Sequence, residues 1–188
     1  MLENYPKEIT STDGTALVLR PLVKEDEQSL IEFFSRIPEE ERWFLRDNME
    51  DPEVVQQWVQ NLDYEKILPL VAVKQADNTI IANVRLHRRP AECLRHVAHL
   101  RIRVDPQYRH QRLGTWMLLD TIKLAMSVGI EKLIAEFVEG VEQPAMNAAR
   151  KLDFVEQAVL KEYVKDRQGR YRSLIIMVKS LYREWGDF

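Results

Sequence analysis

A strand, a helix and a second strand follow one another in the middle of the chain, and this order constrains the fold most. Apolar and polar residues alternate over 96–104, helical periodicity covers 113–128, and a further strand is expected over 132–138. Turn residues place hairpins on both sides, over 68–86 and 155–179. A single strand–helix–strand unit between hairpins predicts a mixed α/β sheet and excludes a doubly wound parallel one.

The remaining expected elements complete a sheet of about seven strands flanked by helices. A first strand is expected over 16–20, closed by Pro21. Asp51 followed by Pro52 is a typical helix start. Helices are expected over 24–37, 39–46, 52–62 and 144–152.

The composition predicts one globular domain over residues 1–188. Hydrophobic residues make up 45% of the chain and the net charge is −3, which excludes intrinsic disorder. A single cysteine, Cys93, excludes a disulfide scaffold. The N-terminus lacks a signal pattern, and no apolar run reaches the roughly 18 residues of a membrane span. We therefore expect a cytoplasmic protein.

Charge is unevenly distributed along the chain. Residues 1–84 hold 17 acidic and 8 basic residues, whereas residues 85–112 hold 2 acidic residues, 8 arginines and all four histidines. Clustered arginine suits phosphate, so the basic segment is compatible with nucleic acid or with a small phosphorylated cofactor. An ordinary solvated basic face is the plainer alternative.

The run from Val104 to Thr115 carries the clearest chemistry. A strand ends at Val104, Asp105 and Pro106 turn the chain, and the following loop leads straight into a helix. The unpaired N–H groups and partial positive charge of a helix N-terminus suit pyrophosphate. Gly114 would let the backbone approach such a group closely. The run predicts an anion cradle, although a glycine-containing turn before a helix is also common elsewhere.

This run resembles the cofactor loop of the GNAT N-acetyltransferases, which reads Arg/Gln-x-x-Gly-x-Gly/Ala. Arg109, Leu113 and Gly114 match, and Arg112 stands where the family has its first loop glycine, which is tolerable if its φ is negative. The upstream segments resemble, more loosely, the acetyltransferase module of bacterial protein-lysine acetyltransferases. Further matches keep the family's order at Leu19-Arg20-Pro21, Gly129-Ile130, Gln143-x-x-Met146, Lys151-Leu152-Asp153-Phe154 and Gly169-x-Tyr171.

The resemblance implies a GNAT-like, mostly antiparallel sheet in which the fourth and fifth expected strands, 96–104 and 132–138, splay apart beside a β-bulge in the fourth. It also implies acetyl-CoA as cosubstrate and no metal. The pantetheine arm would lie between the splayed strands, with the pyrophosphate on amides of the loop. The implied cofactor-binding residues are Ile102, Arg103, Val104, Arg109, His110, Gln111, Arg112, Leu113, Gly114, Thr115, Gln143 and Met146.

The implied chemistry is direct attack of a primary amine on the thioester. Many relatives carry a catalytic Glu where this chain has His99, so His99 is the candidate general base. A surface or hydrogen-bonded strand histidine is the alternative. The position of the family's usual acid, a tyrosine, is Ala149 here, and Tyr163 and Tyr171 are candidate substitutes.

The acidic helices after the first strand suggest a negative rim that attracts a cationic amine, such as a protein lysine, an N-terminus or a polyamine. Ordinary solvated helix faces are the plainer alternative. The expected partner is a small-molecule or protein amine, with no nucleic acid or membrane; the sequence gives no oligomeric state. A catalytically degenerate acyl-CoA-binding module is the alternative, motivated by Arg112, Ala149 and Asp153. A nucleic-acid-binding function of residues 85–112 is disfavoured by the pI of about 5.9.

Overall fold

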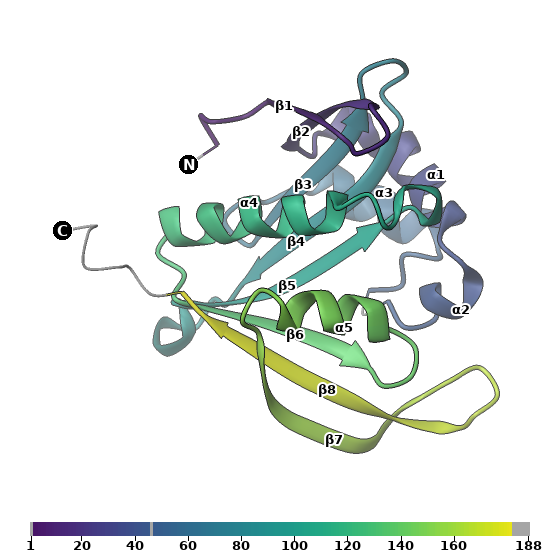
Figure 1. Ribbon diagram of the computed structural model, residues 1–188, viewed down its shortest axis with the longest axis vertical. Coiled ribbons are helices and arrows are strands. Elements are labelled where there is room, and N and C mark those ends of the chain that lie inside the picture. Colours follow the sequence, from purple (N-terminus) through teal and green to yellow (C-terminus); the bar gives the residue numbers. More distant parts are fainter. Residues whose placement is uncertain (1, 46, 182–188) are drawn as a thin grey trace.

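The computed structural model describes residues 2–45 and 47–181 (Figure 1). Eight strands form one sheet in the order β1-β2-β3-β4-β5-β6-β8-β7. Neighbouring strands are antiparallel except β5 and β6, which are parallel. The predicted mixed, mostly antiparallel fold class is therefore confirmed. The strands are β1 (Lys7–Thr10), β2 (Ala16–Pro21), β3 (Ile67–Lys74), β4 (Ile80–Arg88), β5 (Val97–Val104), β6 (Lys132–Val138), β7 (Val155–Lys165) and β8 (Tyr171–Ser180).

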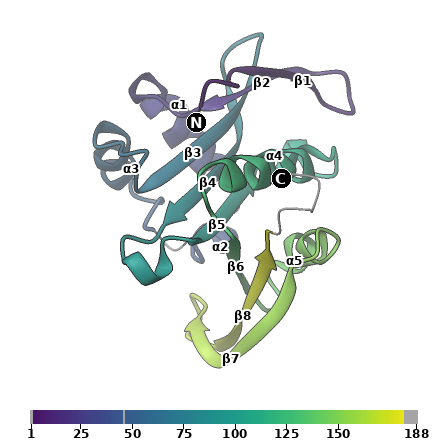
Figure 2. The ribbon, with the colours of Figure 1, turned by 90° about the vertical axis from the view of Figure 1, so that its left-hand side faces the viewer.

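Helices cover both faces of the sheet. α4 (Leu113–Ser127) and α5 (Gln143–Arg150) lie on one face, and α1 (Glu27–Arg36) and α3 (Pro52–Gln60) lie on the other (Figures 1 and 2). We call these the α4/α5 face and the α1/α3 face. One apolar cluster packs α4 and α5 on the sheet, and a second packs α1 and α3. Among the described helices, none combines the length and the apolar character needed to cross a bilayer.

Two elements differ from the sequence-based expectation. The four-residue strand β1 was not predicted, because its sequence Lys-Glu-Ile-Thr has no apolar run, and it raises the number of strands to eight. Helix α2 (Glu39–Arg42) is shorter than the predicted 39–46. After Arg42 the backbone continues in tighter turns, with Phe44 N donating to Glu41 O at 3.1 Å, and the indole N–H of Trp43 donates to Lys165 O at 2.7 Å. Position 46 lies outside the described residues, as do position 1 and positions 182–188 of the predicted domain.

The strands β5 and β6 part after a short paired stretch. They pair only from Val97↔Lys132 to His99↔Ile134, whereas β5 stays paired with β4 up to Val104. β6 is paired with β8 over its whole length, so each of the two strands follows its antiparallel neighbour and they diverge. The predicted splay is confirmed. The implied β-bulge is absent from the β4–β5 pair, whose register runs without a shift.

Candidate active site

The loop after β5 ends in an uncapped helix N-terminus. Asp105 is buried, accepts a hydrogen bond from Gln107 N at 3.0 Å and forms an ion pair with Arg36 of α1 at 2.6 Å, which fixes the turn. No side chain caps α4, and the N–H of Trp116 bonds to Arg112 O at 3.0 Å. The N–H groups of the first turn before Trp116 therefore have no acceptor within the helix, which leaves donors for an anion.

Gly114 brings α4 close to β5. A Cβ atom at this position would stand 3.4 Å from Val104 Cγ2, at the short limit of ordinary van der Waals contact. Its φ is not in the left-handed region, so the glycine is explained by this close approach and by access to the helix N-terminus.

The Arg109 side chain is turned away from the helix N-terminus. Its two Nη atoms donate to the two carboxylate oxygens of Glu41 at 2.7 and 2.8 Å, and its Nε donates to Val104 O at 3.1 Å. Arg109 therefore ties the loop to α2 and to the end of β5. In this arrangement its contribution to anion binding is limited to the backbone.

His99 lies where β5 and β6 part. It is the last β5 residue paired with β6, and its side chain is on the α1/α3 face, because Ala98 belongs to the cluster under α4 and side chains alternate along a strand. Arg89 donates to His99 Nε2 at 2.8 Å, and Glu136 Oε1 of β6 is 3.8 Å from Nδ1. Since arginine can only donate, Nε2 holds the lone pair and the neutral ring carries its proton on Nδ1.

The electrostatic surroundings keep His99 neutral. Burial and then the Arg89 guanidinium lower its pKa below the ordinary value of 6.5, while the Glu136 carboxylate opposes them and Arg101 lowers the pKa further. From the sequence, Arg101 and Arg103 on the same strand would be expected to lower the pKa of His99. Arg101 does contribute, but burial and Arg89 act more strongly, and Arg103 is not among the causes.

A second histidine lies directly across from His99 on β4. His87 pairs with His99 in the sheet register, and its Nε2 is buried without a hydrogen-bond partner among the described residues. Burial, followed by Arg101 and Arg85, lowers its pKa to about 3. His87 is therefore neutral at physiological pH and gives His99 an uncharged neighbour.

The same face also carries two linked arginines. Arg85 of β4 lies across from Arg101 of β5, and both donate to Oδ2 of Asp47, at 2.8 and 2.6 Å. Like charges placed opposite each other repel, so the Asp47 carboxylate between them stabilises the pair. Burial opposes ionisation of Asp47, but the two guanidiniums outweigh it and lower its pKa.

Comparison with known proteins identifies the family. The sequence profile of the acetyltransferase (GNAT) family matches residues 28–154, well over half of the chain. The chain belongs to the GNAT acetyltransferase family. Acetyl-CoA-dependent acetyl transfer is the activity of this family in general. No curated protein sequence matches the chain.

Solved GNAT structures share the fold at low sequence identity. The GNAT domain of PAT from S. lividans has 16% identity and a TM-score of 0.76, covering 95% of this chain and 98% of that one. A ribosomal-protein-alanine N-acetyltransferase from Brucella melitensis has 23% identity and a TM-score of 0.72, covering 87% and 99%. A protein from Salmonella typhimurium, solved with its cofactor acetyl-CoA, has 16% identity and a TM-score of 0.74, covering 89% and 95%.

Arg112, which stands where GNAT proteins have their first loop glycine, has a backbone conformation that favours glycine. Arg112 has φ 62°, in the left-handed region that glycine adopts without strain, and His110 has φ 63°. The condition under which Arg112 would be tolerated without strain, a negative φ, is therefore not met. An arginine in this region carries local backbone strain, and its side chain is exposed.

The other implied cofactor residues lie on β5, on the loop and first turn of α4, and on α5. Ile102 O and Val104 O accept from Arg103 Nη1 at 2.8 Å and from Arg109 Nε at 3.1 Å, and each carbonyl has a second lone pair. Gln143 begins α5 and donates to Asn147 at 3.1 Å. His110 and Thr115 are exposed, Gln111 is half-buried, and Leu113 and Met146 are buried in the core. Binding of the cofactor by these residues stays a prediction.

The candidate acids do not lie in the parting of the strands. Ala149, at the position of the usual tyrosine, is buried on α5. Tyr163 and Tyr171 are 64% and 58% exposed on the β7–β8 hairpin. Nothing in the described contacts brings either hydroxyl to His99.

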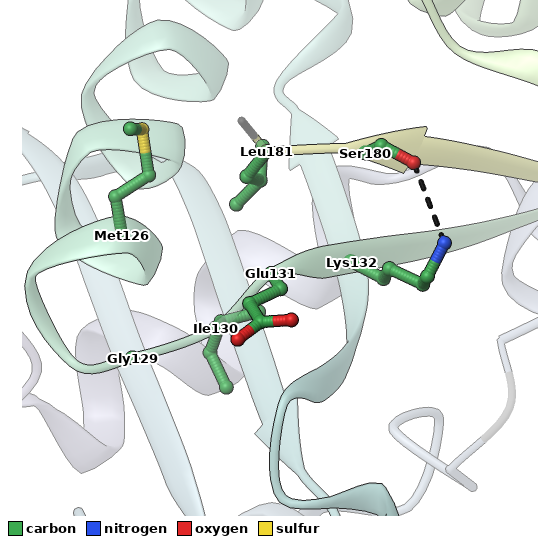
Figure 3. A pocket seen from close by; sticks show the side chains of 7 residues that line it. All are labelled: Met126, Gly129, Ile130, Glu131, Lys132, Ser180 and Leu181. Carbon is green, nitrogen blue, oxygen red and sulfur yellow. Dashed lines mark hydrogen bonds between the residues drawn. The ribbon is translucent and has the colours of Figure 1, made fainter. Parts of the chain in front are cut away.

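A cavity lined by described residues is remote from the loop. It has a volume of about 420 Å³ and lies where α4 ends and β6 begins (Figure 3). α4 has 15 residues, so the cavity is separated from the helix N-terminus by about 22 Å of helix. It is lined by Met126, Gly129, Ile130, Glu131, Lys132, Ser180 and Leu181.

Sequence reasoning missed Asp47, Arg85, His87 and Glu136. The sequence did contain a signal for two of them. Arg85 and His87 are two residues apart, as His99 and Arg101 are on the next strand, so each pair lies on one face of its strand. The ion pairs were not visible from sequence, and they join six of the eight arginines of the basic segment to carboxylates. Its carboxylate partners are Asp47 for Arg85 and Arg101, Glu65 for Arg88, Glu92 for Arg95, Glu142 for Arg103 and Glu41 for Arg109.

Proposed function

We propose that the protein transfers an acetyl group from acetyl-CoA to a primary amine by direct attack, with His99 as the general base. The observation that carries this proposal is the position of His99 at the last residue pair before β5 and β6 part, with a neutral imidazole. A base is most effective when it is unprotonated at the working pH and within reach of the reacting amine.

The chain's own groups fit acetyl-CoA, which supplies the activated acetyl group. The β5 edge over 100–104 has no strand partner in the described sheet, so its backbone can pair with the amides of the pantetheine arm. The uncapped N–H groups over 113–115 can bind the pyrophosphate. A backbone N–H on the β5 edge would also stabilise negative charge that develops on the thioester oxygen.

His99 would take the proton from the ammonium group of the acceptor, directly or through a water. Its lone pair on Nε2 accepts from Arg89, which is exposed and can turn away. Glu136 beside Nδ1 then stabilises the imidazolium that forms, because the carboxylate favours the charged ring. Once neutral, the amine nitrogen attacks the thioester carbonyl carbon. The C–S bond then breaks and CoA leaves as the thiol, because its sulfur takes up the proton that the acylated nitrogen loses.

The acceptor expected from the sequence is a cationic amine, such as a protein lysine, which acidic residues over 39–53 would attract. Much of that acidic charge is paired with arginine, which weakens this attraction. Glu39 and Glu50 contact Arg167, Glu41 contacts Arg109, and Asp47 contacts Arg85 and Arg101. A primary amine, in a small molecule or a protein, is the acceptor class proposed here.

A catalytically degenerate acyl-CoA-binding module is the second candidate, and buried Ala149 in place of the usual acid favours it. Two measurements separate the candidates: acetyl-CoA binding by calorimetry, and release of free CoA thiol with a panel of amines. We expect both binding and amine-dependent thiol release. Binding without thiol release for any amine would favour the regulatory module, and absence of binding would contradict both.

A further inference from the structure

Among the described contacts around His99, three arginines face two carboxylates. Arg89 donates to Nε2 of His99 and Glu136 lies 3.8 Å from its Nδ1, and the remaining three groups form one cluster beside them. Arg85 and Arg101 both donate to one oxygen of Asp47, so one carboxylate faces two guanidiniums. Across the parting of the strands, Arg103 and Glu142 form a balanced pair at 2.8 Å. The α1/α3 face therefore carries an excess positive charge two residues from the proposed base.

Arg85 accounts for the fixed part of this charge. Its side chain is 3% exposed and lies over the rings of Trp58 and Phe34, 5.3 and 5.9 Å from their centroids. Burial lowers its pKa to about 10, which still leaves it protonated at neutral pH. Arg85 therefore requires the Asp47 carboxylate permanently, because an unpaired buried charge is strongly destabilising.

Arg101 is the accessible partner. Its side chain is 26% exposed, and among the described residues its one hydrogen bond is from Nη1 to Asp47. A guanidinium has five N–H donors, so the others remain available for a planar anion. Arg101 and His99 stand on the same face of β5, about 7 Å apart along the strand.

We propose that the acceptor is an amino carboxylate, with its amine at His99 and its carboxylate on Arg101. This inference rests on the proposed acetyl transfer and specifies its substrate class. A molecule whose amine and carboxylate are a few bonds apart spans the two side chains, because the arginine side chain is long and flexible. The carboxylate neutralises the excess charge that Asp47 leaves, whereas a polyamine or an isolated lysine side chain would add to it.

The test compares matched acceptors. Free amino acids are assayed against their α-amides and against the corresponding decarboxylated amines, with acetyl-CoA saturating. Peptides with an acidic residue next to a free N-terminus form a separate arm, which distinguishes a peptide source of the carboxylate from a free amino acid. We expect the carboxylate to raise kcat/KM by about 10- to 100-fold over the amide, as charge-assisted hydrogen bonds do.

The variant Arg101→Met should remove most of this preference. It leaves Asp47 paired with Arg85, so the buried charge stays balanced and the fold is retained. Its expected signature is a higher KM for the amino acid with little change in KM for acetyl-CoA. The matched control is Arg88→Met, which removes a strand arginine bound to Glu65 at 3.0 Å and should leave the preference unchanged.

Three outcomes overturn the inference. If amides, polyamines or lysine peptides without a nearby carboxylate are acetylated as fast as amino acids, the substrate class is wrong although acetyl transfer stands. If no amine is acetylated, the proposed function fails. The carboxylate site is then tested separately, by calorimetric binding of amino acids and their amides to the protein with CoA present. Equal binding of amino acids and their amides, or preferential binding that persists in Arg101→Met, would contradict a carboxylate site at Arg101.

Discussion

Replacing His99 by alanine is expected to lower kcat by about 10²-fold or more while leaving acetyl-CoA binding unchanged. The imidazole is the neutral base nearest the parting of β5 and β6, and alanine removes it without altering the strand pairing on either side. The measurement is steady-state turnover at saturating amine, with acetyl-CoA affinity determined by calorimetry on the same preparation. A wild-type rate for His99→Ala would show that His99 is not the base.

The variant His99→Glu and the pH profile distinguish a base from a structural residue. A base acts only when unprotonated, and burial together with Arg89 lowers the pKa of His99 below 6.5. The wild-type kcat should therefore hold at neutral pH and fall only as the pH drops below that value. His99→Glu should recover part of the rate and move the acid limb lower, towards the ordinary carboxyl range near about 4.3. A profile identical in both proteins would contradict the assignment.

Gly114→Asp is expected to abolish acetyl-CoA binding. The new side chain adds bulk 3.4 Å from Val104 Cγ2 and a negative charge on the N-terminal turn of α4, where a phosphate would sit. Acetyl-CoA at 100 times its Kd should stabilise the wild-type protein by about 2.7 kcal/mol, which is measured as a rise in Tm. The variant should show no rise. Normal binding by Gly114→Asp would mean that the cofactor lies elsewhere.

Two variants of the same loop serve as comparisons. Gly114→Ala adds the same Cβ without the charge and should retain weaker binding, which separates electrostatics from crowding. Arg112→Gly supplies the residue suited to φ 62°, so we expect a free energy of unfolding within about 1 kcal/mol of wild type. CoA affinity should change by less than about tenfold, because the Arg112 side chain is exposed; a complete loss would make it a principal ligand.

The elements that position the site follow from local sequence. The β5–loop–α4–β6 order was predictable because alternation, the Asp105-Pro106 turn and Gly129 are signals within a few residues of the structure they specify. The bounds of β6 agree fully with those predicted, and α4 differs by one residue. The short strand β1 was missed, because its pairing with β2 and the Lys7–Asp120 ion pair at 2.5 Å are tertiary contacts.

The electrostatics of the site were not predictable in the same way. A count of charges gave an acidic N-terminal part and a basic middle, but folding pairs them, as in Glu41 with Arg109 and Asp47 with Arg85. Partners 38 or more residues apart carry no local pattern. The excess charge at Arg101 emerges only once each carboxylate has been matched with its neighbours.

The structure of the protein with acetyl-CoA bound would test the central claim most directly. We expect the pyrophosphate on the backbone N–H groups at the start of α4, the pantetheine arm along the β5 edge over 100–104, and the thioester beside His99. A cofactor seated in the cavity at the end of α4, or a thioester on the far side of β5 from His99, would contradict it.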